Sequence, residues 1–358
     1  MNEHQVCIEI GGMAIVVRTG SGDFACLLEN RYGPFVVGAG PRAEAPNGLH
    51  AAVEASAPGR TVRGERLPAR SGDVNAGSDS RASDFQFPVS SFLLDVELVP
   101  PGLIGETEDA RVRMQGGRWV MERSDFYAEW DPERGRGWVR QSANPFSIDS
   151  LLRILHSLIL ARQGGFLVHA ASAIRNGRAF LFSGVSGAGK TTISRLAPPD
   201  VALLTDEISY VRSQESGVRS QNPEVRKQKA EGGGRIEDQQ CGASDSAISS
   251  PALTPGTRHL SPAFVAFGTP FAGELARLGE NLSAPIAALY FLSQGPVNRI
   301  EAVSAAEAAR LLLQNILFFA QDEALVREVF ESASDFVSRV PVGRLVFLPE
   351  RAVWELIK

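Results

Sequence analysis

Residues 180–196, FLFSGVSGAGKTTISRL, constrain the fold of this chain more than any other segment. The segment passes from an apolar run through a glycine-rich loop and Lys-Thr-Thr to a second apolar run. Its centre, residues 184–191, fits the Walker A pattern G-x-x-x-x-G-K-[ST]. In that pattern backbone N–H groups surround a phosphate, and only small residues allow so close an approach. A strand before the loop and a helix from about Thr192 after it are therefore expected.

The loop predicts a nucleotide site with a defined set of contacts. Lys190 is expected to reach the β- and γ-phosphates, and the Thr191 hydroxyl is expected to bind Mg²⁺. The N-terminus of the following helix adds unpaired N–H groups and partial positive charge. The residues expected to contact the nucleotide are Gly184, Ser186, Gly187, Ala188, Gly189, Lys190, Thr191 and Thr192.

Two adjacent acids follow the next apolar strand. Asp206 and Glu207 end the apolar strand predicted at residues 201–204, VALL, one residue beyond it. Ligands of open α/β sheets bind beyond the carboxyl ends of the strands, so both carboxylates are expected near the phosphate loop. An acid in this place can bind Mg²⁺ or take a proton from an attacking hydroxyl.

A β-hairpin is predicted directly before the loop. Residues 165–174 and 178–184 are apolar runs joined by Asn176-Gly177, which is the strongest short hairpin signal. His169 lies within the first of these strands. A lone histidine on a strand is more often structural than catalytic, so the sequence alone does not assign it a role.

The chain before the hairpin predicts a β-rich N-terminal domain over residues 1–145. Residues 5–18 indicate two short strands, and residues 91–142 indicate several more, separated by turn signals. A small antiparallel β-domain is therefore expected. Residues 37–83 are rich in Gly, Pro, Ala, Ser and Arg, which predicts a flexible segment.

A linking helix is expected over residues 146–163, between the two domains. Ser147 is a plausible N-cap, Asp149 favours the positive end of the helix, and Gly164 is a plausible stop. Its apolar positions repeat at helical spacing, which predicts that it packs between the two parts of the chain.

A phosphate-loop domain is expected over residues 164–358. Within it, residues 211–260 have almost no core-forming side chains, which predicts a disordered insertion. The other elements expected are strands at 263–269, 287–293 and 344–348, the last completing the sheet, and helices beginning at a capping box at 304–307 and near Asp322.

Composition narrows the class of protein. The net charge of −5 indicates no excess of basic residues for binding nucleic acid. The three cysteines lie far apart and show no CxxC spacing, which is typical of proteins in a reducing cytosol. The N-terminus resembles no signal peptide, and the longest apolar helix candidate is interrupted by Arg153 and His156. A cytoplasmic protein with no nucleic-acid partner and no membrane insertion is expected.

Residues 165–196 followed by LLTDEIS (203–209) resemble the HPr kinase/phosphorylase family and its HPr-kinase-like relatives. In that family a strand carrying His precedes the Gly-Lys-Ser/Thr loop, and a short helix and a strand ending in paired acids follow. The resemblance covers about residues 164–210 well and 263–348 more loosely, through FGTPFAGE and the terminal helices. Before residue 145 only the β-rich leader of the HPr-kinase-like group is similar. The resemblance implies an α/β fold of the phosphoenolpyruvate-carboxykinase-like kind.

The resemblance also implies roles for individual residues. Asp206 would be the base that activates an acceptor hydroxyl, and His169 would lie near the transferred phosphate. The family pair is usually Asp-Asp, so Glu207 departs from it and its metal role is open. Residues implied to hold the nucleotide phosphates or Mg²⁺ are Gly184, Gly187, Gly189, Lys190 and Thr191.

Two weaker candidates lie downstream. Arg299 follows a strand and a loop, and it could clamp the γ-phosphate as a bidentate donor. Residues 267–271, followed by Glu274 and Arg277, predict a rigid turn, for which an ordinary strand-to-helix loop is the favoured interpretation.

An ATP- and Mg²⁺-dependent kinase that phosphorylates a hydroxyl, on a serine of a protein or peptide, is the leading hypothesis. A nucleotide-driven ATPase or GTPase switch is an alternative, although no guanine-reading N-K-x-D is present. The third hypothesis is a catalytically degenerate kinase that only binds a nucleotide or peptide. A small-molecule kinase of the shikimate-kinase type is disfavoured by the hairpin and the β-domain. The sequence identifies neither the acceptor nor the oligomeric state, and it does not indicate whether the reverse reaction occurs.

Overall fold

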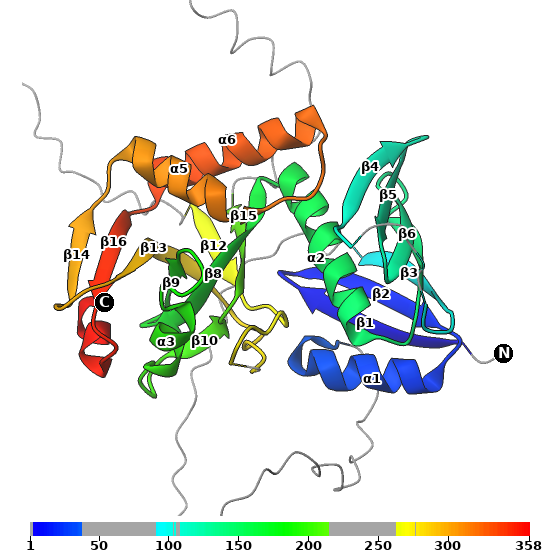
Figure 1. The fold of residues 1–358 in the computed structure, drawn as a ribbon, viewed down its shortest axis with the longest axis horizontal. Coiled ribbons are helices and arrows are strands. Elements are labelled where there is room, and N and C mark those ends of the chain that lie inside the picture. Colours follow the sequence, from blue (N-terminus) through cyan, green and yellow to red (C-terminus); the bar gives the residue numbers. More distant parts are fainter. Residues whose placement is uncertain (1–2, 38–90, 103, 105–107, 215–262, 276) are drawn as a thin grey trace, which may run out of the picture. The chain divides into compact units, whose positions relative to one another are not determined.

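The computed structural model describes residues 3–37, 91–102, 104, 108–214, 263–275 and 277–358. These residues are mixed α/β, with two β-sheets and helices, and all belong to one compact unit (Figure 1). Of the two segments predicted to lack structure, residues 38–83 and 215–260 lie outside the described residues.

Seven strands form the N-terminal sheet, in the order β1-β2-β3-β7-β6-β5-β4. The first two strands form an antiparallel hairpin that turns at Gly11-Gly12, as predicted. The strands are β1 (His4–Ile10), β2 (Met13–Thr19), β3 (Ser91–Leu98), β4 (Arg111–Gln115), β5 (Arg118–Arg123), β6 (Phe126–Asp131) and β7 (Arg136–Gln141).

This sheet is mixed, so the expectation of an antiparallel domain was wrong. Strand β3 runs parallel to both of its neighbours, β2 and β7. Parallel neighbours cannot be joined by a tight turn and need a crossover connection. The connection from β2 begins with helix α1 (Gly22–Tyr32), which the sequence pattern did not reveal and which the Ser21 side chain caps by accepting from the Phe24 N–H.

Helix α2 (Pro145–Arg162) is the predicted linking helix, but its predicted cap was wrong. The N-cap is Asn144, whose side chain accepts from the Phe146 N–H, and Pro145 occupies the first helical position. Ser147 is instead buried and donates its hydroxyl to Asp125 Oδ2 at 2.7 Å. Gly164, with φ +69°, follows the helix as predicted.

Nine strands form the second sheet, along β10-β8-β11-β12-β13-β16-β14, with β9 paired to β8 and β13 and with β15 paired to β8. The strands are β8 (Gly165–Arg175), β9 (Arg178–Ser183), β10 (Ala202–Thr205), β11 (Ile208–Ser213), β12 (Phe264–Phe267), β13 (Ser283–Gln294), β14 (Arg299–Ala302), β15 (Ile316–Leu317) and β16 (Val342–Phe347).

One prediction about this sheet was wrong. Residues 211–213, which were assigned to the disordered insertion, belong to β11, where they pair with β12. The final strand predicted at 344–348 is confirmed as β16, which lies between β13 and β14. The predicted hairpin is confirmed: β8 and β9 are antiparallel, and Asn176 and Gly177 both have positive φ, as a tight I′-type turn needs.

The other helices are α3 (Lys190–Arg195), α5 (Ala305–Asn315) and α6 (Glu323–Arg339), with short 3₁₀ helices at Gly33–Phe35 (η1) and Arg351–Leu356 (η3). Half of the predicted capping box forms. The Glu307 N–H donates to Ser304 Oγ, but the Glu307 carboxylate pairs with Arg344 at 2.6 Å instead of returning to the cap. Across the described part of the chain, no helix combines the length and apolar character that a bilayer span requires.

The last described 3₁₀ helix, η3, packs against the helix that follows the glycine loop. The Trp354 indole N–H donates to the Ile193 carbonyl at 3.1 Å, and its ring meets Phe182 of β9 edge-on at 5.4 Å. The guanidinium of Arg175 donates to the carbonyls of Trp354 and Ile357. Residues far along the sequence therefore pack against the strand and the helix on either side of the glycine loop.

Candidate active site

Strand β8 brings the glycine loop and the acid pair together. Its residue Ser172 pairs with Leu181 of β9 and also with Thr205 of β10, so these two strands flank β8 on opposite sides. Both run antiparallel to β8, and therefore their carboxyl ends point the same way. The loop leaves β9 after Ser183 and the acids follow Thr205, so both lie at one edge of the sheet, as predicted.

Two glycines of the glycine loop have left-handed backbone. Gly187 and Gly189 have φ values of +79° and +109°, which L side chains rarely adopt. A Cβ added to Gly189 would lie 2.6 Å from Cζ of Phe347 in β16. Helix α3 begins at Lys190, two residues earlier than expected.

Lys190 lies folded over its own loop. Its ammonium donates to the carbonyls of Gly184 at 2.8 Å and Val185 at 3.3 Å. Burial lowers the pKa of Lys190, while the negative charges of Glu207 and Glu274 act against that shift. The cation therefore lies within electrostatic range of two carboxylates from different parts of the chain.

Glu274 is a site residue that the sequence interpretation set aside as part of an ordinary loop. The Thr191 hydroxyl donates to Glu274 Oε2 at 3.2 Å. Neighbouring ligands of an octahedral Mg²⁺ with bonds of about 2.1 Å lie roughly 3 Å apart, so this oxygen pair fits the ion. The predicted Mg²⁺ role of Thr191 thus gains a partner that the sequence did not indicate.

Asp206 fastens the segment that carries Glu274. Its side chain is buried; Oδ1 accepts from the Gly273 N–H at 2.8 Å and Oδ2 from the Leu275 N–H at 2.9 Å. A Cβ added to Gly273 would lie 3.0 Å from Asp206 Oδ2 and 3.0 Å from the Glu207 Cβ. This backbone therefore passes directly against the acid pair.

Glu207 meets a cation from the linking helix. Arg153 of α2 donates to Glu207 Oε2 at 3.3 Å, and its guanidinium lies over the Phe271 ring at 5.1 Å. Burial raises the pKa of Glu207, and the charge of Asp206 adds to the rise, although Arg153 opposes it. Arg153 was noted in the sequence only as a charge that interrupts an apolar helix, so its place in the site was missed.

His169 lies on β8 and pairs across the ladder with Ile208, the residue after the acids. Burial lowers the pKa of His169, and the positive charges of Lys190 and Arg153 lower it further. The lowered pKa favours the neutral imidazole near pH 7. His169 precedes Ala170, which pairs with Ser183 at the end of β9, so the backbone places His169 beside both the loop and the acids.

Arg299 lies on β14, where it pairs across the ladder with Val346 of β16. Among the described residues it makes no hydrogen bond or ion pair with the glycine loop or the acid pair, so its role as a γ-phosphate clamp stays a prediction. Its guanidinium pairs with Glu301 at 2.7 Å. The glycine loop receives a hydrogen bond from β13, where Gln294 Nε2 donates to the Gly187 carbonyl at 2.9 Å.

Within the described ranges, no three side chains of His, Cys, Asp or Glu converge in the manner of a protein-only metal cage. Mg²⁺ in phosphoryl-transfer sites commonly has one or two protein ligands, with waters and substrate phosphates completing its shell. Comparison of the chain with protein-family models and with curated proteins finds no match to either.

Proposed function

We propose that this protein is an ATP-dependent kinase that transfers the γ-phosphoryl group to the hydroxyl of a serine in a protein or peptide. The proposal includes an HPr-kinase-like relationship and a phosphoenolpyruvate-carboxykinase-like fold for residues 164–358. One observation carries it: the Walker A loop and the acid pair leave the two sides of β8 at one sheet edge. A phosphate site and a proton acceptor are then neighbours, which phosphoryl transfer to a hydroxyl requires.

The nucleotide half of the site needs positioning and charge neutralisation. The loop amides and the N-terminus of α3 would surround the phosphates, and Lys190 would leave its two loop carbonyls to donate to the β- and γ-oxygens. Thr191 and Glu274 would hold Mg²⁺, which neutralises phosphate charge when it is bound. The present contact between these two side chains keeps both oxygens close together.

The acceptor half needs a base. Both carboxylate oxygens of Asp206 already accept backbone N–H groups, from Gly273 and Leu275, so they are occupied in holding the Glu274 segment. Glu207 is partly exposed and its pKa is raised, which suits proton transfer near neutral pH. We therefore assign proton acceptance to Glu207 and the fastening of the Glu274 segment to Asp206, which revises the role that the family resemblance implies.

The transfer step balances without any further reactant. The serine Oγ–H gives its proton to Glu207 as a new Oγ–P bond forms. The bond between the γ-phosphorus and the β,γ-bridging oxygen breaks, and ADP leaves with that electron pair. Neutral His169 would donate a hydrogen bond to an oxygen of the transferred group.

A nucleotide-driven ATPase switch is the second candidate, and one observation favours it. Arg153 holds Glu207, while Asp149, one turn earlier on α2, accepts from Arg31 and Tyr32 of helix α1. The nucleotide site is thus connected through α2 to the N-terminal sheet, as a switch would need. Steady phosphate release without any acceptor would support this reading over the kinase.

The test uses the full chain, γ-labelled ATP, Mg²⁺ and a library of serine-containing peptides. The parent is expected to label peptides, and Lys190→Ala to abolish labelling. Glu207→Gln should keep ATP binding and lower kcat by about 10²-fold or more, the usual scale for a lost general base. The matched control Glu331→Gln alters an exposed acid on α6 and should label at the parental rate. Parental labelling by Lys190→Ala would end the proposal.

A further inference from the structure

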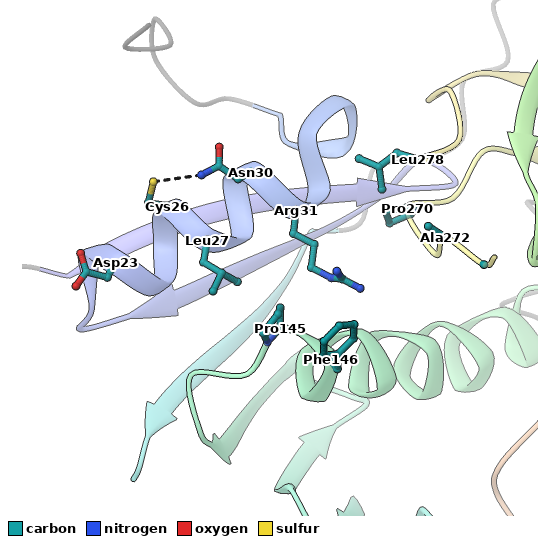
Figure 2. Close-up of a pocket in the computed structure, with 11 residues that line it drawn as sticks. Asp23, Cys26, Leu27, Asn30, Arg31, Pro145, Phe146, Pro270, Ala272 and Leu278 are labelled. Atoms are coloured by element: carbon teal, nitrogen blue, oxygen red, sulfur yellow. Dashed lines mark hydrogen bonds between the residues drawn. The ribbon is translucent and has the colours of Figure 1, made fainter. Parts of the chain in front are cut away.

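A cavity of about 850 Å³ lies beside the candidate active site, apart from the glycine loop (Figure 2). Helix α1, the first turn of α2, and Pro270, Ala272, Gly273 and Leu278 line it. The walls are held together by direct contacts, since Asn281 Nδ2 donates to the Pro34 carbonyl just beyond α1 at 3.2 Å. The proposed kinase reaction uses none of the α1 residues.

One wall of this cavity is also a wall of the candidate active site. Gly273 lines the cavity, and its N–H donates to Asp206. The next residue, Glu274, contacts Thr191 of the glycine loop. The cavity and the acid pair are therefore separated by a single stretch of backbone, so a chain bound in the cavity needs few further residues to reach the site.

An exposed aromatic ring marks the mouth of the cavity. Phe146 has 62% of its surface exposed, although it is the second residue of a well-formed helix. The guanidinium of Arg31 lies 4.9 Å from the centre of its ring, and Asp149 holds that guanidinium in turn. Figure 2 shows Arg31 extending from α1 toward this ring. Arg31 therefore covers one face of the Phe146 ring, while most of the side chain stays exposed, and Leu27 and Leu278 add apolar surface nearby.

The far end of the cavity carries negative charge. Asp23 lines the cavity in the first turn of α1, and among the described residues it makes no ion pair. Arg31 at the other end is already neutralised by Asp149. The lining therefore offers an apolar surface near the active site and a carboxylate away from it. Asp23 and Arg31 are eight residues apart, or roughly 12 Å along a helix, a span that an extended peptide covers with about four residues.

We propose that this cavity binds the phosphoryl acceptor as a peptide segment, an inference that rests on the proposed kinase function. The segment carries an apolar side chain close to its serine, which packs on Phe146, and a basic residue about four positions further along, which faces Asp23. The continuity with the acid pair and the complementary charge select this occupant over a free metabolite, whose binding would not need a groove of this length.

The experiment uses the full chain and a serine-centred peptide library in which single positions are scanned with Leu, Phe, Lys and Glu. Phosphate transfer is measured with γ-labelled ATP and Mg²⁺, and binding is measured separately with fluorescent peptides in the absence of nucleotide. The variants are Phe146→Ala, Asp23→Lys and, as a matched control, Phe330→Ala. Phe330 is a comparably exposed phenylalanine on α6 that does not line the cavity.

We expect the parent to prefer peptides that carry an apolar residue near the serine and a Lys about four positions further along. Phe146→Ala should raise KM for these peptides at least tenfold with kcat within twofold, because the ring binds substrate and transition state alike. Asp23→Lys should reverse the preference from Lys to Glu, and Phe330→Ala should behave as the parent does.

The two ideas fail in different ways. If the parent phosphorylates peptides and Phe146→Ala does so with the same KM, the cavity proposal is overturned and the kinase stands. If peptides bind to the parent and not to Phe146→Ala while no phosphate is transferred, the cavity stands and the kinase falls. If the parent binds no peptide more tightly than Phe146→Ala does, the cavity proposal is overturned whatever the transfer assay shows.

Discussion

His156 of α2 is expected to make the folded protein sensitive to mild acid. Its ring is fully buried, and neither nitrogen has a hydrogen-bond partner among the described residues. It meets Tyr210 of β11 edge-on, with ring centres 5.7 Å apart. Burial lowers the pKa of His156 from 6.5 to about 3. The folded protein therefore keeps this ring neutral at pH values where the unfolded chain takes up a proton.

The size of the effect follows from proton linkage. Because the folded pKa is the lower one, the unfolded state binds more protons below pH 6.5, and the free energy of unfolding falls as the pH falls. Each pH unit between the two pKa values is worth about 1.4 kcal/mol. From pH 6.5 to about 5 the loss is therefore roughly 2 kcal/mol, a large fraction of ordinary stability.

The assay is urea unfolding at pH values between about 5 and 8, comparing the parent with His156→Leu. Leucine cannot titrate, so the parent should lose roughly 2 kcal/mol more than this variant on acidification. Tyr210→Phe is the matched control, because it removes only the neighbouring hydroxyl and should keep the parental pH dependence. Equal slopes for the parent and His156→Leu would refute the reasoning. A ring-carbon NMR titration of the folded parent checks the same pKa without a variant.

Arg153→Met should raise the pKa of Glu207 further, because it removes the cation that lowers that pKa, and the acid limb of the transfer rate should move to higher pH. The control Arg162→Met, at the end of the same helix, should leave the pH dependence of the transfer rate unchanged. If Arg153→Met also left it unchanged, Arg153 would have no role in the site. Gly189→Ala should weaken nucleotide binding at least about tenfold by calorimetry, because its Cβ would overlap the Phe347 ring at a φ that alanine disfavours. Parental affinity would show that the loop tolerates the side chain.

Local sequence signals predicted the strands and the loop around β8. Asn176-Gly177 predicts a tight turn because both residues accept positive φ. The spacing of the glycines and Lys190 predicts the phosphate loop that follows. Asp206 and Glu207 could be placed because strands on either side of β8 end at the same sheet edge. In each case the information lies within a few residues of the feature.

The missed residues depend on packing between distant segments. Arg153 lies 54 positions before Glu207, and Glu274 lies 83 positions after Thr191. Nothing in the local pattern of a helix or a loop indicates which distant charge it will meet. The wrong N-cap at Ser147 has a similar cause, since its hydroxyl is taken by a tertiary partner.

The contact between η3 and α3 means that the helix after the glycine loop cannot complete its packing until the last described 3₁₀ helix has been synthesised. The Ile193 carbonyl of the loop's helix receives its indole partner from a residue 161 positions later. When the glycine loop leaves the exit tunnel, the surface on which it rests has not yet been translated. We therefore expect nascent chains that end between β10 and β16 to bind nucleotide poorly, so the proposed activity would begin only after most of this domain has been made.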